Sequence, residues 1–243
     1  MVINSLQNAH VKAWMKLHQT KYRQQSFQFL VEGEHLIQEA MKSNALEVLI
    51  LKEGCDSPFK FHTIIEVSEA VFHKLSQTVS GGSVMGVCRF RMAQQLEGQR
   101  FMVCDRVQDP GNLGTLIRTA LSFGFDQVIL SKDCVDVTND KVIRATQGAL
   151  FQSSIVIMDL HEAIPLLKAQ GVTVYATGFD AAQNLSTIPT IYPVAFVLGN
   201  EGQGVQKDLM ALCDETICIE MSMFDSLNVA VAGAILAYHF RKG

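Results

Sequence analysis

Short apolar runs alternate with helical patterns after residue 100, and this alternation constrains the fold more than any other feature of the chain. Runs of strand length lie at 101–104, 127–130, 154–158, 172–176, 194–198 and 216–219. Helical patterns at 113–123, 140–150, 160–169, 205–212 and 227–240 fill most of the gaps. Strands that are apolar throughout and separated by helices are typical of a parallel sheet covered on both faces. The sequence therefore predicts an α/β domain built on a parallel sheet.

The first 93 residues combine helices and strands in a less regular order. Helical patterns lie at 8–20, 33–43 and 68–77, and strand-like runs lie at 48–51, 63–67 and 84–90. A polar stretch over 91–99 separates this part from the alternating region. We therefore expect two domains, a small α/β sandwich over 1–93 and a larger parallel-sheet domain over 94–243.

Composition narrows the class of protein. Of the 243 residues, 48% are hydrophobic and 18% are charged, a balance that excludes a disordered protein. The longest apolar stretch, 229–238, is about half of the roughly 20 residues that a membrane-spanning helix needs. The first residues lack the basic and apolar segments of a signal peptide. These features predict a cytoplasmic protein without membrane contact.

The cysteines do not indicate a metal site. None of the six forms a Cys-x-x-Cys pair, and no histidine-rich spacing accompanies them. Structural zinc sites need close ligand pairs, so we expect no metal. Several cysteines lie within apolar runs, which favours buried free thiols in a reducing compartment.

Charge is unevenly distributed along the chain. Residues 1–93 carry 10 basic and 8 acidic side chains, a net charge of +2, whereas residues 94–243 carry 10 and 16, a net charge of −6. Within the first 31 residues there is no acidic side chain, but there are four basic ones: Lys12, Lys16, Lys21 and Arg23. Such a cluster either binds a polyanion through counterion release or is a solvated helix face.

Ligands of open parallel sheets bind beyond the carboxyl ends of the strands, where this chain has three polar loops. In the first loop, 105–112, Pro110-Gly111 is a turn signal, and Asn112 is placed to cap the helix that follows. Arg118 lies six residues later beside apolar residues. An arginine in such a place binds a carboxylate or a phosphate, or makes a structural ion pair.

The second and third loops also contain features of a site. Leu198-Gly-Asn-Glu-Gly-Gln-Gly204 is neither a Walker A loop nor a first-strand Gly-x-Gly-x-x-Gly fingerprint, although its glycines allow close backbone approach. Its Glu201 would suit a cation or an arginine better than a phosphate. In the third loop, 219–228, Ser226 resembles the N-cap of a helix rich in small residues, with Asn228 in its first turn.

Three stretches resemble the motifs of the SpoU/TrmH RNA methyltransferases, in the family's order and near its spacing. They are Asp109-Pro-Gly-Asn-Leu-Gly-Thr-Leu-Ile-Arg-Thr-Ala120, Leu198-Gly-Asn-Glu-Gly-Gln-Gly-Val205 and Ser226-Leu-Asn-Val-Ala-Val-Ala232. Residues 142–151 are similar to the helix between the first two motifs, and residues 29–37 to the substrate-binding domain of many members. The resemblance covers almost the whole chain, and three motifs in order are highly specific.

The resemblance implies an enzyme that transfers a methyl group from S-adenosylmethionine to a ribose 2′-hydroxyl in ribosomal or, less often, transfer RNA. It implies the SPOUT fold, in which the C-terminal segment of the parallel sheet forms a trefoil knot, and a homodimer packed through knot-region helices. Residues of the motif loops would hold the cofactor. By position these are Thr177, Leu198, Gly199, Glu201, Gly202, Ile219, Met221, Ser226, Leu227 and Asn228.

Arg118 matches the arginine that the family is credited with using to activate the hydroxyl. Because a guanidinium keeps its positive charge, we expect it to clamp a phosphate and stabilise the developing alkoxide rather than act as a base. The resemblance implies that Asn112, Ser226 and Asn228 position the reacting groups. It also allows Glu201 to orient an arginine. The candidate RNA contacts are then Lys12, Lys16, Lys21, Arg23 and Arg118.

The third motif departs from the family pattern. Glu220 replaces a proline, and the loop 222–225 lacks a glycine and is one residue short. The altered loop keeps open a catalytically inactive RNA-binding homodimer of the same fold. A nucleotide-dependent enzyme on an ordinary doubly wound fold is a further alternative, which the missing first-strand glycine fingerprint disfavours.

Overall fold

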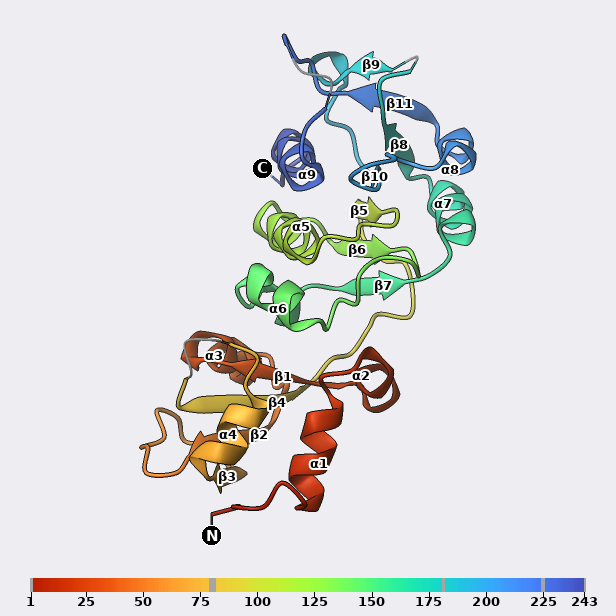
Figure 1. The fold of residues 1–243 in the computed structure, drawn as a ribbon. Helices are drawn as coiled ribbons and strands as arrows, with labels where there is room; N and C mark the ends of the chain where they lie inside the picture. Colours follow the sequence, from red (N-terminus) through yellow and green to blue (C-terminus); the bar gives the residue numbers. More distant parts are fainter. Residues whose placement is uncertain (1, 79–81, 181, 224–225, 243) are drawn as a thin grey trace. The chain divides into compact units, whose positions relative to one another are not determined.

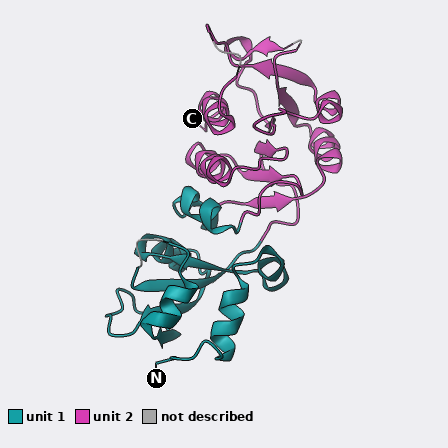
Figure 2. Ribbon diagram, in the orientation of Figure 1, with its two compact units in different colours: residues 1–91, 138–152 teal, residues 92–137, 153–243 magenta. Residues whose placement is uncertain are grey.

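The computed structural model describes residues 2–78, 82–180, 182–223 and 226–242 (Figure 1). The chain forms two compact units (Figure 2), one of residues 1–91 with 138–152 and the other of residues 92–137 with 153–243. The change of unit at 91/92 falls at the start of the polar stretch that separates the two expected domains. Residues 138–152 return to the first unit, whereas the expected division treats each domain as one continuous segment.

A four-stranded sheet of mixed direction forms the centre of the first unit. Its order is β1 (Gln28–Glu32), β4 (Val84–Arg89), β2 (Leu46–Lys52) and β3 (Ile64–Val67). β4 is antiparallel to both neighbours, and β3 is parallel to β2. The helices of this unit are α1 (Ala9–Lys16), α2 (Thr20–Ser26), α3 (Glu34–Lys42), α4 (Glu69–Leu75), α6 (Asp140–Thr146) and the 3-10 helix η1 (Ala149–Phe151).

Helix α2 and strand β1 differ from the sequence-based expectation. The single helix expected over 8–20 is shorter, ending at Lys16, and α2 begins only at Thr20. α2 lacks an apolar stripe, because its one buried residue is Arg23, so hydrophobic periodicity cannot detect it. β1 does alternate, with Phe29 and Val31 buried between half-buried neighbours, but over only five residues. The helix expected over 140–150 is interrupted at Gln147, where φ is 50°.

The second unit contains a seven-stranded parallel sheet, as the alternation predicts. Among the described residues its order is β7-β6-β5-β10-β8-β11-β9, and each neighbouring pair is parallel. The strands are β5 (Arg100–Cys104), β6 (Gln127–Leu130), β7 (Ile155–Ile157), β8 (Thr173–Thr177), β9 (Gln183–Asn184), β10 (Val194–Leu198) and β11 (Glu215–Cys218). The two-residue edge strand β9, followed by the 3-10 helix η2 (Leu185–Thr187), is not expected from the sequence.

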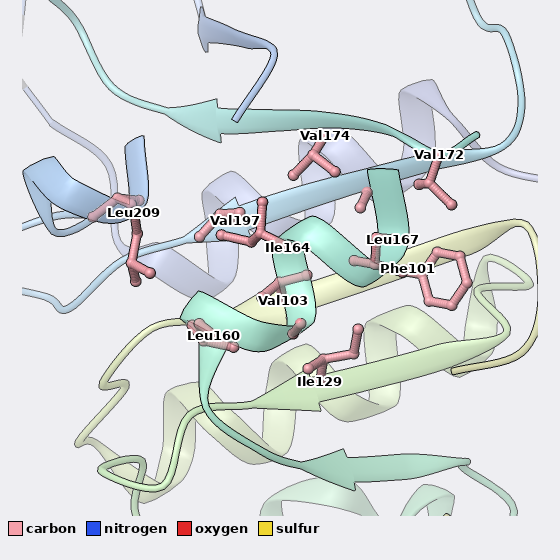
Figure 3. Close-up of a cluster of buried hydrophobic side chains, with 13 residues drawn as sticks. Phe101, Val103, Ile129, Leu160, Ile164, Leu167, Val172, Val174, Val197 and Leu209 are labelled. Carbon is pink, nitrogen blue, oxygen red and sulfur yellow. The ribbon is translucent and has the colours of Figure 1, made fainter. Parts of the chain in front are cut away.

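Helices cover both faces of this sheet. On one face α7 (Leu160–Ala169) and α8 (Lys207–Leu212) bury Leu160, Ile164 and Leu209 against alternate strand residues such as Val103 and Val197 (Figure 3). On the other face lie α5 (Pro110–Ser122) and α9 (Val229–His239). A Cβ at Gly233 of α9 would lie 2.3 Å from Leu116 Cδ2 of α5, so the side chain of Leu116 fills the space that the glycine leaves between these two helices.

Candidate active site

The carboxylate of Glu201 joins two of the three loops at the carboxyl edge of the parallel sheet. Its Oε1 accepts hydrogen bonds from the backbone N–H of Asp109 at 3.0 Å and from Asn112 Nδ2 at 3.1 Å. Its Oε2 accepts from the backbone N–H of Gln108 at 3.2 Å. Burial opposes ionisation, but these hydrogen bonds outweigh it and hold the pKa of Glu201 below its usual value. Glu201 therefore anchors the first loop. The sequence suggests an arginine or another cation as its partner, but the groups that donate to it are two backbone amides and the side-chain amide of Asn112.

Asn112 and Asn228 extend the same network to the third loop. Asn228 Nδ2 donates to Asn112 Oδ1 at 2.9 Å, and Asn112 in turn donates to Glu201. The acceptor of Asn228, Oδ1, receives the backbone N–H groups of Ala230 at 2.9 Å and Val231 at 3.3 Å. In each side chain the amide nitrogen donates to one partner and the amide oxygen accepts from another, so the orientation of both amides is defined.

Both helix caps differ from those predicted. α5 begins at Pro110 rather than after Asn112, and its N-cap is Asp109, whose side chain accepts from Asn112 N at 2.8 Å. α9 begins at Val229, and its N-cap is Asn228, so Ser226 is outside the helix. The predictions of Asn112 and Ser226 as caps are therefore wrong. Each loop contains more than one residue whose side chain can cap a helix, and the backbone conformation decides at which of them the helix begins.

The candidate cofactor residues lie at the ends of neighbouring strands. Thr177 ends β8 and donates from Oγ1 to Val197 O at 2.9 Å, while Leu198 ends β10 and is buried. After β10 the loop closes tightly, because Asn200 and Gly204 exchange backbone hydrogen bonds of 3.1 and 2.9 Å. A Cβ on Gly199 would lie 2.0 Å from the carbonyl carbon of Gly204, so this loop accepts only glycine there. The remaining candidates follow at 202, 219, 221 and 226–228.

A second set of contacts, which the sequence analysis did not single out, holds the same loop. Asp105 is fully buried, and its carboxylate accepts from Gln206 N and Nε2, both at 3.0 Å, and from Arg106 Nε at 3.1 Å. Arg106 Nη1 donates to Gln203 Oε1 at 2.9 Å and Nη2 to Gly204 O at 3.4 Å. Arg106 has a φ of 52°, which is uncommon for a residue with a side chain. We call these contacts of Asp105 and Arg106 the clamp on the glycine loop. The one feature of the sequence that indicates it is a carboxylate directly after an apolar strand.

Arg118 is separate from this network. It lies on α5 six residues beyond Asn112, about 9 Å along the helix axis, and is exposed. Its carbonyl accepts from Ser122 Oγ at 2.8 Å. The structure thus joins Asn112, Glu201 and Asn228 by hydrogen bonds but leaves the Arg118 guanidinium facing solvent.

Glu220 is held by a neighbouring turn. Its Oε1 accepts from the backbone N–H of Ser186 at 3.2 Å and from the Ser186 hydroxyl. The hydroxyl hydrogen bond is the main cause of a pKa below the usual value for Glu220. This charge is therefore tied to η2. Of the shortened loop 222–225, residues 224 and 225 lie outside the described residues.

Of the candidate RNA contacts in the first unit, three are accessible and one is not. Lys12, Lys16 and Lys21 are exposed. Arg23 is only 7% exposed and donates to Leu17 O and Thr20 Oγ1, both at 2.9 Å. Its Nε also donates to Thr138 Oγ1 at 3.3 Å. Arg23 is therefore a structural residue that ties α2 to the returning segment, and its assignment as an RNA contact was wrong.

An apolar groove lies between α5 and α9, next to Asn112 and Asn228. Its lining includes Val231, Ile235 and Tyr238 from α9, which are 47%, 37% and 58% exposed. The groove therefore places a substantial apolar surface beside the amide network.

The described ranges contain neither a cluster of side chains that could bind a metal nor a helix that could span a membrane. No group of three His, Cys, Asp or Glu side chains there could hold a metal ion. In the same ranges, no helix has both the length and the apolarity that a bilayer crossing requires. All six cysteines are free thiols, and only Cys88 and Cys104 are fully buried.

The fold and the loop cluster define an α/β protein with a site at the carboxyl edge of a parallel sheet, and comparison with known proteins identifies its family. The SpoU rRNA Methylase family matches residues 99–238, and the MRM3-like substrate binding domain matches residues 8–86. The chain belongs to the SpoU rRNA methylase family.

Similar proteins cover nearly the whole chain. The 23S rRNA (guanosine(2553)-2′-O)-methyltransferase RlmP of Bacillus subtilis is 37% identical over 98% of each chain. The mitochondrial rRNA methyltransferase 3 of Homo sapiens is 31% identical over 91% of this chain and 69% of its own length. The AdoMet-bound rRNA methyltransferase from Sinorhizobium meliloti superposes with a TM-score of 0.87 and 28% identity, covering 99% of this chain and 97% of that chain.

Proposed function

We propose that this protein methylates a ribose 2′-hydroxyl in ribosomal RNA, with S-adenosylmethionine as the methyl donor. The observation that carries the proposal is the hydrogen-bonded line from Asn228 through Asn112 to Glu201, which joins the three motif loops of this family. Relatives at both the sequence and the structural level are named rRNA methyltransferases. Transfer RNA is the less favoured substrate.

The residues at the strand ends fit the cofactor. S-adenosylmethionine has an apolar ring face and hydrogen-bonding edges, which suit uncharged residues such as Leu198, Ile219 and Leu227 with their backbone groups. The glycine loop after β10 would hold it together with the loop before α9. The full set is Thr177, Leu198, Gly199, Glu201, Gly202, Ile219, Met221, Ser226, Leu227 and Asn228. When bound, the cofactor supplies a methyl group already activated by a sulfonium, so no metal is needed.

The protein's own groups position the nucleotide and stabilise charge. Arg118, which is exposed and cationic, clamps the phosphate next to the target ribose and stabilises negative charge on the attacking oxygen. Asn112 and Asn228 hold the ribose side of the site in one orientation, and Ser226 assists them. The lowered pKa of Glu201 makes its carboxylate a weak base, so Glu201 anchors the loops and is a poor proton acceptor.

The groove between α5 and α9 supports a homodimer. Its exposed apolar side chains adjoin Asn112 and Asn228, so a second copy packed there would bury apolar surface and close the site. We place this interface at the knot-region helices, within a C-terminal trefoil knot of the SPOUT type. The protein acts in the cytoplasm without membrane or metal. Residues 94–243 carry the catalytic domain, and residues 1–93 bind RNA with Lys12, Lys16 and Lys21.

Methyl transfer to defined RNA tests the proposed function. Purified protein would be incubated with methyl-labelled S-adenosylmethionine and ribosomal RNA from a strain that lacks its gene. Label in one alkali-resistant dinucleotide is the expected result, since a 2′-O-methyl group blocks cleavage at that linkage. Absence of label in every RNA, together with absence of cofactor binding, would instead favour the catalytically inactive RNA-binding homodimer. Cofactor binding without label would indicate that the substrate is another form of the RNA, such as an assembly intermediate.

A further inference from the structure

Phe27 combines two unfavourable features at one position. It is the C-cap of α2, directly after Ser26, and has a φ of 56° and a ψ of 24°, a left-handed conformation that is usually taken by glycine at helix ends. For a bulky residue this conformation is a genuine outlier. Its side chain is also 55% exposed, so burial does not offset the strain. Strained residues persist only where the surrounding structure holds them, and they are more frequent at functional sites.

The backbone on either side of Phe27 is firmly held. The carbonyl of Phe27 accepts from the backbone N–H of Phe90 at 3.0 Å. The preceding carbonyl, that of Ser26, accepts from Arg89 Nη1 at 3.2 Å, and Ser26 Oγ accepts from Gln28 N at 3.2 Å. The ring therefore projects from a turn whose conformation is set before any ligand arrives.

The charges around this turn favour a polyanion. Arg91 follows Phe90, the hydrogen-bond partner of Phe27, and is exposed, and so is Lys21 on α2. The nearby carboxylate of Glu47 is neutralised by Arg89, which contacts it through Nε. The first 31 residues contain no acidic side chain, so none from this segment offsets the charge of Lys21.

We propose that the ring of Phe27 stacks on an unpaired base of the RNA substrate, while Lys21 and Arg91 contact phosphates on either side of that nucleotide. Single-stranded bases stack on exposed aromatic rings irrespective of their sequence, and fixed cations hold the adjoining backbone. A preformed turn makes such stacking more effective, because the ring loses little freedom on binding. The inference rests on the proposed function and adds a loop or bulge in the RNA as the feature that the first unit recognises.

Three substitutions in the full chain separate stacking from packing. Phe27→Asn removes the ring and tolerates the left-handed backbone, Phe27→Leu keeps an apolar side chain without a π face, and Phe27→Trp keeps a π face. Binding to an unmodified 23S rRNA transcript would be measured by filter binding, alongside the thermal midpoint and the affinity for S-adenosylmethionine. We expect Phe27→Asn and Phe27→Leu to weaken RNA binding about tenfold and Phe27→Trp to restore it. Cofactor affinity should not change.

The sign of the stability change is the decisive control. Phe27→Asn should raise the thermal midpoint because it relieves strain, while it weakens RNA binding. A lowered midpoint accompanied by weaker binding would mark the ring as a packing residue and overturn the proposal. RNA affinity equal to wild type in Phe27→Leu would also overturn it, as would a change in oligomeric state with unchanged RNA affinity. Labelled methyl transfer by the wild type on the same transcript tests the proposed function separately.

Discussion

Asn228 donates a 2.9 Å hydrogen bond to Asn112, and this contact joins the beginnings of α9 and α5 across 116 residues of sequence. Asn228 also caps its own helix, and Asn112 passes the connection on to Glu201. The three loops of the site are therefore held in register by side-chain amides and one carboxylate. This arrangement means that loss of one amide should disturb catalysis more than folding.

Asn228 has two tasks that substitution can separate. Asn228→Ser keeps a capping oxygen but removes the donor to Asn112, whereas Asn228→Ala removes both. We expect Asn228→Ser to lower kcat/KM for methyl transfer by roughly 10²-fold, comparable to losing one positioned donor, with little change in stability. Asn228→Ala should lose about 1 kcal/mol of stability in addition. Urea unfolding and labelled methyl transfer measure the two effects, and equal activity of Asn228→Ser and wild type would contradict the positioning role.

Arg118 should affect turnover without affecting folding. Because its guanidinium is exposed and separate from the loop network, Arg118→Ala should leave the unfolding midpoint and the affinity for S-adenosylmethionine unchanged. Methyl transfer should fall by about 10²–10³-fold, the usual loss for one charge-stabilising group. Arg118→Lys, which keeps the charge but not the bidentate geometry, is the matched control and should recover only part of the activity. Undiminished turnover in Arg118→Ala would remove this residue from the mechanism.

Glu201 should make stability depend on pH in the acid range. Its pKa is lower in the folded chain than in the unfolded one, so its contribution to stability is complete above the unfolded value, about 4.5, and is lost as pH falls through the folded value. The difference in unfolding free energy between wild type and Glu201→Gln should therefore be constant near neutral pH and shrink as the solution is acidified. Urea titrations between pH 3 and about 7 would reveal this. A difference that grows with acidification would have the wrong sign.

Arg106 offers a test of the clamp on the glycine loop. Arg106→Gly removes the contacts to Gln203 and Gly204 yet suits the positive φ, whereas Arg106→Ala removes them and keeps the strain. We expect both variants to bind S-adenosylmethionine about tenfold more weakly, because about 1–2 kcal/mol of loop ordering is lost. Arg106→Gly should be the more stable by about 1 kcal/mol. Calorimetric titration would measure the affinity of both variants for the cofactor. If Arg106 had a purely structural role, the more stable Arg106→Gly would bind the cofactor more tightly than Arg106→Ala.

The proposed homodimer can be tested at the centre of the groove. Ile235→Lys places a charge among the exposed apolar residues of α9 without touching the sheet, so the chain should fold with a near-normal midpoint. We expect dissociation to monomers in sedimentation equilibrium and loss of most methyl transfer. Ile64→Lys, an exposed apolar position in the first unit, serves as the matched control and should remain dimeric. A wild type that is monomeric at micromolar concentration would contradict the dimer itself.

Local pattern was sufficient for most elements of the second unit, but not for its short β9 and η2, for α2 or for the caps. The central strands of the parallel sheet, such as β5, β6 and β10, are apolar on both faces, so the sequence reveals them without information on what packs against them. α2 lacks such a pattern, since it is held by Arg23 bonding to Leu17, Thr20 and Thr138. The caps of α5 and α9 could not be chosen, because Asp109, Asn112, Ser226 and Asn228 all have side chains that cap helices.

The sequence by itself determined the α/β class, the parallel sheet and the identity of the motif residues, because hydrophobic periodicity and residue chemistry are local properties. Only the tertiary structure decided which of those residues meet. The order of β5, β10 and β11 in the sheet brings together loops that lie about 90 to 116 residues apart, and a hydrogen bond depends on that placement to within a few tenths of an ångström. Tertiary packing also decided the exposure of two residues near α2. Arg23 is buried, although the sequence groups it with the surface lysines, and Phe27 is exposed directly after the helix.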